Sequence, residues 1–148
     1  MRKSRKNQGF TLLEIIIVII IIGVLASLAL PRFFRTTENS RAMEALTHLS
    51  SIRQSMQRCF LPGNSYMPPA PMTPCNTFPA LDVDDPGDLA IYPRTHFTYA
   101  WNPAPTATTF RIVATRNNFE AAAPAPGSTI TINQDGVKTG TGVYQNIR

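Results

Sequence analysis

One uninterrupted apolar stretch near the N-terminus constrains this chain more than any other feature. It spans residues 10–30, and its only ionisable side chain is Glu14. At about 1.5 Å per residue, a helix of this length crosses the hydrocarbon core of a bilayer. Residues 15–22 are all β-branched, which favours a strand in water. In lipid the backbone must satisfy its own hydrogen bonds, so we predict one membrane-spanning helix.

The positive charge of the chain is concentrated before this stretch. Four of its 14 Lys and Arg residues lie within residues 1–9, and the remaining ten are nearly balanced by nine Asp and Glu. The body of the chain therefore gives little electrostatic reason to bind nucleic acid. Because basic flanks stay on the cytoplasmic side of a membrane, we expect the leader in the cytoplasm and the head outside.

Two ordinary kinds of segment compete with a functional one here. A secretory signal peptide usually has an apolar core of about 7–15 residues. Residues 27–29 have the small-x-small pattern of a signal cleavage site, but Pro31 follows too closely. A plain single-pass anchor accounts for the length but not for Glu14, since an acid within a membrane is costly and commonly functional.

Gly9 followed by Phe10-Thr11-Leu12-Leu13-Glu14, after a short basic leader, resembles the cleavage and methylation motif of type IV prepilins. Gly23 also matches, and Pro31 falls where that family has a helix-kinking proline. The resemblance covers residues 1–35. The family includes type IV pilins, type II secretion pseudopilins and DNA-uptake pseudopilins.

The resemblance implies that a prepilin peptidase cuts between Gly9 and Phe10 and methylates the new Phe10 amine. It also implies that Glu14 pairs with the amine of a neighbouring subunit and sets the register, because a buried carboxylate is costly unless paired. Gly23 and Pro31 would let the helix loosen. The implied partners are the peptidase, identical or related pilin subunits and an inner-membrane assembly platform.

A second, amphipathic helix is predicted from about Thr36 to Gln57, continuous with the anchor. Its apolar residues recur every three or four positions. They are Ala42, Ala45 or Leu46, Leu49, Ile52 and Met56. The breaker run at residues 61–64 predicts the end of the helix.

Alternating apolar residues near the C-terminus predict a small antiparallel sheet. The predicted strands are His96–Trp101, Thr109–Arg116 and Ser128–Asn133, with a turn at 134–136 and another strand starting at Val137. We predict an α+β fold in which the long helix, half transmembrane and half amphipathic, packs on this sheet. Residues 119–127 are predicted as a loop, and the tail after Gly140 as loose.

These elements define a leader (1–9), a transmembrane and assembly helix (10–35) and a pilin-like head (36–148). In an exported head, Cys59 and Cys75 are predicted to form a disulfide. The proline-rich loop after the helix also holds four aspartates, weak candidates for calcium ligands: Asp82, Asp84, Asp85 and Asp88. Their spacing lacks the ligand alternation and distal Glu of an EF-hand loop, so a solvated turn is favoured.

The sequence gives no basis for an enzyme or a cofactor. His48 is expected on the helix surface and His96 on an exposed strand, and no metal-ligand spacing, nucleophile elbow or phosphate-binding glycine loop is present. Tyr99 and Trp101 have rings that can stack on nucleic acid. Alternating aromatic residues in a strand are more typical of a core.

The favoured function is therefore structural. We expect a subunit of a type IV pilus or pilus-like filament, held in the inner membrane as a single-pass precursor and later part of a pilus or periplasmic filament. The alternative is a type II secretion pseudopilin. A DNA-uptake pseudopilin and a non-polymerising single-pass binding protein are less favoured. A cysteine pair just after the long helix also differs from the C-terminal disulfide loop of adhesive pilins.

Overall fold

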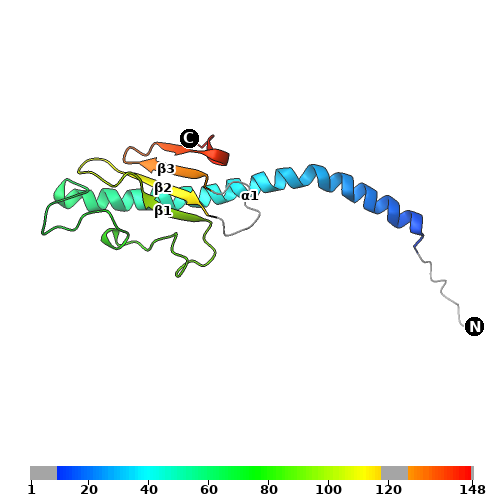
Figure 1. Ribbon diagram of the computed structural model, residues 1–148, viewed down its shortest axis with the longest axis horizontal. Coiled ribbons are helices and arrows are strands. Elements are labelled where there is room, and N and C mark those ends of the chain that lie inside the picture. Colours follow the sequence, from blue (N-terminus) through cyan, green and yellow to red (C-terminus); the bar gives the residue numbers. More distant parts are fainter. Residues whose placement is uncertain (1–9, 118–126, 148) are drawn as a thin grey trace, which may run out of the picture. The chain divides into compact units, whose positions relative to one another are not determined.

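The computed structural model describes residues 10–117 and 127–147 (Figure 1). Its elements are α1 (Leu12–Gly63), the 3-10 turn η1 (Pro79–Leu81), β1 (Phe97–Trp101), β2 (Arg111–Arg116), β3 (Thr129–Asn133), β4 (Lys138–Gly140) and the 3-10 turn η2 (Gly142–Tyr144). The chain divides into two units, residues 1–38 and 39–148, and each is described by itself. The leader, and all of the predicted loop at 119–127 except Gly127, lie outside the described residues.

The first unit is helical from Leu12 onward and buries almost none of its apolar surface. Every side chain of residues 10–36 is exposed, except that of the half-buried Ala26. Among the described residues, α1 is the one helix long and apolar enough to cross a membrane. The helix continues through Gly23 and Pro31 without interruption. The β-branched run at 15–22 is therefore helical despite its strand propensity, as predicted for a membrane-spanning segment.

The second unit contains an antiparallel sheet with the strand order β1-β2-β3-β4. In its register Tyr99 lies opposite Ala114, which in turn lies opposite Ile130. Alternate residues of the first three strands are buried on one face: Phe97, Tyr99, Ile112, Ala114, Ile130 and Ile132. The predicted α+β class and the antiparallel strands are confirmed.

The part of α1 that lies in the second unit runs along this sheet (Figure 1). Its buried residues form one apolar cluster with those of the strands: Ala42, Ala45, Leu49, Ile52 and Met56. The predicted stripe is confirmed, with Ala45 rather than Leu46 fully buried. The helix runs six residues beyond the predicted bound at Gln57, and it ends within the breaker run at residues 61–64, as that run predicts. Pro62 and Gly63 lie in the last turn, and the left-handed Asn64 (φ 48°) ends the helix.

The C-terminal tail is ordered through residue 147, so its predicted looseness is wrong. Thr141 donates a backbone hydrogen bond to the Thr129 carbonyl at 2.9 Å. The turn η2 then places the Tyr144 side chain in the core, with its ring centroid 5.8 Å from that of Phe97. Burial of this aromatic side chain stabilises the tail. The alternation of apolar residues did not predict it, because Tyr144 lies outside the strands.

Candidate functional site

The start of α1 is capped by a side chain. The Glu14 backbone N–H donates to Thr11 Oγ1 at 3.2 Å, as in a helix N-cap. The Thr-x-x-Glu spacing is that of a capping box, so the sequence already indicated that Thr11 caps the helix. The prediction for this turn rested only on the charge of Glu14. Because the first turn carries the positive end of the helix dipole, it also favours a carboxylate there.

Glu14 is the only charged side chain from residue 10 to residue 31. Within a bilayer or a helical bundle, an ionised carboxylate at this place needs a cation or several hydrogen bonds to offset its desolvation. Phe10, four residues earlier, is 80% exposed. Gly9, the other residue of the predicted cleavage site, lies outside the described residues.

Gly23 and Pro31 both lie inside α1. A Cβ built on Gly23 meets nothing within 4 Å, so the described chain places no atom against this position. The glycine therefore offers room for close approach by another helix. The predicted flexibility of this stretch stays a prediction.

The disulfide between Cys59 and Cys75 is present, with Cα atoms 6.1 Å apart. Inside its loop, the Tyr66 N–H donates to the Ala107 carbonyl at 2.9 Å, and the Cys75 N–H donates to the Tyr66 carbonyl at 2.8 Å. The Tyr66 ring lies 4.8 Å from that of Phe110. Burial raises the pKa of the Tyr66 phenol. The segment that the disulfide closes is thus held at its ends by the two cysteines and in its middle by Tyr66.

The four aspartates lie further along the same proline-rich loop, where two of them accept hydrogen bonds within turns. Asp85 Oδ1 accepts the Gly87 N–H and Asp88 Oδ1 accepts the Ala90 N–H, each at 2.8 Å. Asp82 and Asp84 are exposed. No group of three or more His, Cys, Asp or Glu in the described ranges is arranged to hold a metal ion. The hydrogen bonds give Asp85 and Asp88 a role in shaping turns.

These aspartates line a groove of about 730 Å³ together with Phe78, Val83 and Ile91. We call it the acidic groove. Gly87, on the same loop, approaches strand β1 closely, since an added Cβ would lie 2.9 Å from Thr98 Cα. The loop is therefore held against the edge strand of the sheet.

Neither histidine has the expected surroundings. His48 is half-buried on α1, and its ring lies edge-on to Tyr99 with centroids 5.8 Å apart. His96 is half-buried before β1, and its backbone carbonyl accepts a hydrogen bond from Arg116 Nη1 at 3.1 Å. Both predictions of an exposed histidine are wrong, because the aromatic face of β1 and the end of β2 cover them.

Tyr99 and Trp101, like Phe97 on the same strand, face the core, as the alternation predicts. Tyr99 is 7% exposed, and Trp101 packs against Phe78 with ring centroids 4.8 Å apart. Burial raises the pKa of the Tyr99 phenol well above its usual range, and the nearby Glu44 and Asp85 raise it further. A base cannot stack on a ring that the protein already covers.

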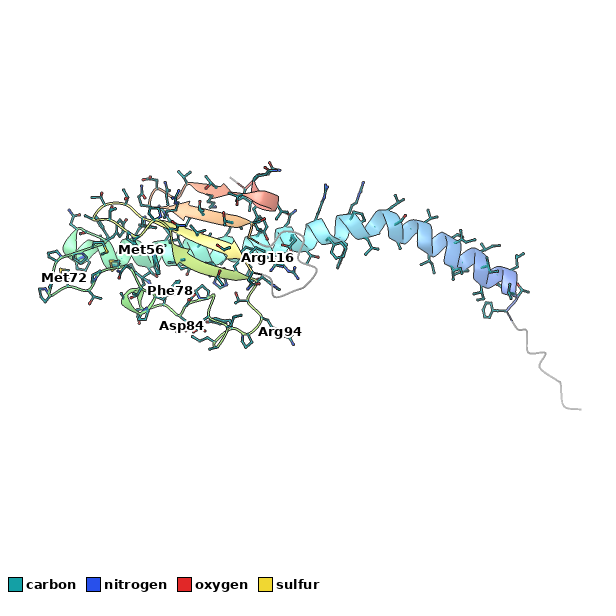
Figure 2. All side chains as sticks on the ribbon, viewed as in Figure 1. Met56, Met72, Phe78, Asp84, Arg94 and Arg116 are labelled. Carbon is teal, nitrogen blue, oxygen red and sulfur yellow. A yellow bond between two sulfur atoms is a disulfide. The ribbon has the colours of Figure 1, made fainter. Side chains whose placement is uncertain are left out.

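Arg116 is a buried residue that the sequence reasoning left without a role. It is 2% exposed, its guanidinium lies 5.9 Å from the Phe97 ring centroid, and Nη1 also donates to the Asn117 carbonyl at 3.2 Å. It continues the two-residue alternation of Ile112 and Ala114, which was the available signal. Arg116 ties the end of β2 to the start of β1 (Figure 2).

Comparison with known proteins identifies the N-terminal part of the chain. Residues 4–30 match the prokaryotic N-terminal methylation motif. The type IV major pilin protein PilA of Myxococcus xanthus (strain DK1622) is 39% identical over 69 residues, which are 45% of this chain and 31% of that protein. The type II secretion system core protein G of Escherichia coli (strain K12) is 38% identical over 66 residues, 45% of this chain and 46% of that protein.

A fimbrial protein of Pseudomonas aeruginosa is 32% identical over 73 residues, which cover 49% of this chain and 46% of that protein. The aligned stretch thus spans less than half the length of each of these relatives. The motif match includes Phe10, Glu14 and most of the apolar half of α1. The chain carries the prokaryotic N-terminal methylation motif, and over less than half of its length it is similar to type IV pilins and to type II secretion core protein G.

Proposed function

We propose that this chain is a structural subunit, a pilin, of a type IV pilus or a related pilus-like filament. The observations that carry the proposal are the match of residues 4–30 to the N-terminal methylation motif and the apolar stretch of α1, none of whose residues is buried. An apolar helix of this length with no partner in its own chain requires lipid or other apolar helices around it.

The precursor is anchored in the inner membrane by residues 10–35, with its leader in the cytoplasm and the head of residues 36–148 outside. A prepilin peptidase cuts between Gly9 and Phe10 and methylates the amine of Phe10. Glycine lets the backbone approach a catalytic site closely, because it has no Cβ. The cut removes four cationic side chains that hold the leader in the cytoplasm and leaves an amine at the membrane edge.

In the filament, Glu14 pairs with the amine of a neighbouring subunit. An unpaired carboxylate among apolar helices is strongly disfavoured, so only the register that brings the two charges together is stable. The exposed apolar side chains of α1 pack against other subunits, Gly23 allows close approach, and Pro31 allows bending. An inner-membrane assembly platform adds the subunits.

A type II secretion pseudopilin is the second candidate. It is favoured by the similarity to core protein G, which is 38% identical to this chain over the aligned residues, compared with 39% for PilA. Both candidates require the same cut and the same polymerisation. The neighbouring genes, encoding a pilus motor or a secretion channel, separate them.

The test is mass spectrometry of the mature N-terminus from membranes that contain the peptidase. We expect a chain that begins with N-methylated Phe10. Gly9→Val is the matched variant, and its added side chain is expected to leave the leader attached. An intact Met1 in the unmodified chain, or a cut after Ala29, contradicts the proposal.

A further inference from the structure

The acidic groove combines negative charge with an apolar wall. Four of the nine acidic residues of the chain fall within residues 82–88, and Phe78, Val83 and Ile91 line the same groove. Ile91 is 50% exposed. Figure 2 shows Phe78 and Asp84 on the loop beside β1. A ligand that fits this surface carries cations next to an apolar group.

The described part of the chain supplies no cation to the exposed acids. Asp82 and Asp84 make no side-chain hydrogen bond or ion pair there, and no metal-binding group of His, Cys, Asp or Glu forms in it. Asp85 and Asp88 use one oxygen each in a turn. The groove therefore presents uncompensated negative charge to a partner.

The same chain carries a complementary surface on α1. Leu28, Arg32 and Arg35 are spaced by four and three residues, so they share one face of the helix. All three are exposed, Leu28 by 69%. Within the described ranges, neither arginine donates a side-chain hydrogen bond. We call these three residues the basic face.

Several other arginines are already engaged inside the head. Arg53 donates to the Gln134 carbonyl at 2.9 Å, Arg58 to Ser55 Oγ at 2.8 Å, and Arg111 to the Asn102 carbonyl at 2.6 Å. Arg116 is buried. Arg94 is exposed, but no second cation lies three or four residues from it. The basic face thus offers two unengaged cations beside a leucine.

We propose that the acidic groove of one subunit binds the basic face of a second copy of this chain, a contact that rests on the proposed filament function. The guanidinium groups of Arg32 and Arg35 donate to the carboxylates of Asp82 and Asp84, and forked arginine–carboxylate pairs fix orientation. Leu28 contacts the apolar wall. Because the groove and the basic face are different surfaces, each subunit can bind one neighbour through each. Such a heterologous contact grows into an open filament when the rotation between neighbours does not close a ring.

The competing occupant of the basic face is the membrane itself. Arginines just beyond a membrane span can bind anionic lipid headgroups. In that case the groove has no part in assembly, and changes to its aspartates leave filaments unaffected. The acidic and basic surfaces must therefore be changed separately and together.

The experiment measures filaments sheared from cells that express the full-length chain. The groove variant is Asp82→Asn with Asp84→Lys, since Asn tolerates the positive φ of 54° at residue 82. The basic-face variant, Arg32→Gln with Arg35→Glu, mirrors it. Each is expected to lower the filament yield about tenfold, and the fourfold variant, which restores one opposite-charge pair, to recover most of it. Asp135→Lys, an exposed acid on the β3–β4 turn, is the control and keeps the normal yield.

The cleaved, membrane-bound amount of each variant is measured by immunoblot, so that misfolded variants are recognised and excluded from the comparison. Normal filaments from the groove variant overturn the contact. It is also overturned if the fourfold variant does not recover filaments although the groove, basic-face and fourfold variants all accumulate normally. Both results leave the filament function standing. Absence of filaments from the unmodified chain, with the leader uncut, overturns the proposed function instead.

Discussion

The two halves of α1 are both rich in apolar residues, but they differ in where those residues lie. From Ile15 to Leu30 the large apolar side chains surround the helix and are 43% to 69% exposed. Between Ala42 and Met56 five apolar residues form one stripe and are at most 4% exposed, while Met43 lies outside the stripe. A stripe indicates a partner within the same chain, whereas an all-round apolar helix requires partners outside it. The first half therefore requires an apolar environment outside its own chain, and the second half packs on its own sheet.

The largest effect is expected from the acid in the first half. Glu14→Ala should leave cleavage after Gly9 largely intact yet reduce filaments to background, because the register no longer depends on pairing a buried charge. Glu44→Ala is the matched control, an exposed acid on the second half of the same helix, and should assemble normally. Mass spectrometry of the N-terminus measures the cleavage, and electron microscopy measures filament assembly. Normal filaments from Glu14→Ala would refute the register role.

Truncation of isoleucine should separate the halves by stability. Ile52 is 1% exposed and Ile19 is 58% exposed. Ile52→Ala is expected to lower the free energy of unfolding of the head by about 2–5 kcal/mol, because a cavity remains in the core. Ile19→Ala should leave it unchanged. Urea unfolding of the full chain in detergent, followed by fluorescence of its one tryptophan, Trp101, measures both. Equal losses would show that the first half also packs within the chain.

Loss of the disulfide should destabilise the head but not the anchor. Replacing Cys59 and Cys75 together by alanine opens a loop with a sequence separation of 16. The chain-entropy treatment gives a loss of about 3 kcal/mol in the free energy of unfolding. Reduction of the unmodified chain is the control and should give a similar loss, while the alanine variant should not respond to reductant. Membrane extraction of both proteins should be the same.

Periodicity in the sequence was enough to predict the buried stripe of α1 and the strands, because both face a core of their own chain. Leu49 and Ile112 stand at the positions that spacings of 3.6 and 2 residues require. The breaker run at residues 61–64 also ended the helix as predicted, and only the bound at Gln57 fell short of it. The tail and the histidines were wrong for another reason. Tyr144 and His48 are placed by aromatic contacts between distant segments, which no local pattern records.

The site was predictable in chemistry but not in arrangement. Glu14 stood out because an acid in an apolar run is costly, and the pairing of Cys59 with Cys75 followed from the export of the head. The acidic groove was not foreseen. Its aspartates are adjacent in sequence, but the apolar wall that Phe78 and Ile91 add depends on how the loop folds against β1.

Two glycines offer a smaller contrast between the units. Gly142 has φ of +62°, and an added Cβ would overlap Ser128 Oγ, whereas a Cβ on Gly23 meets nothing within 4 Å. Gly142→Ala is expected to lower the stability of the head by about 1–2 kcal/mol, the usual cost of a left-handed residue. Gly23→Ala should leave the head unaffected. Thermal unfolding in detergent measures both, and an unchanged midpoint for Gly142→Ala would contradict the tail structure.

The smallest effect concerns the pH dependence of the head. Burial of the Tyr99 side chain, with Glu44 and Asp85 nearby, raises the pKa of Tyr99 in the folded state above its pKa in the unfolded state. The unfolded chain therefore loses the Tyr99 proton first, and this contribution to stability is complete below about pH 10 and lost as the pH rises toward the folded-state pKa.

The Tyr99 hydroxyl makes no hydrogen bond within the described residues, so Tyr99→Phe should change stability at pH 7 by less than about 1 kcal/mol. Above pH 10 it should flatten the loss of stability, with a residual slope from Tyr66. The exposed Tyr92→Phe is the control, and an equal flattening in that variant would show that the slope does not arise from the buried face of the sheet.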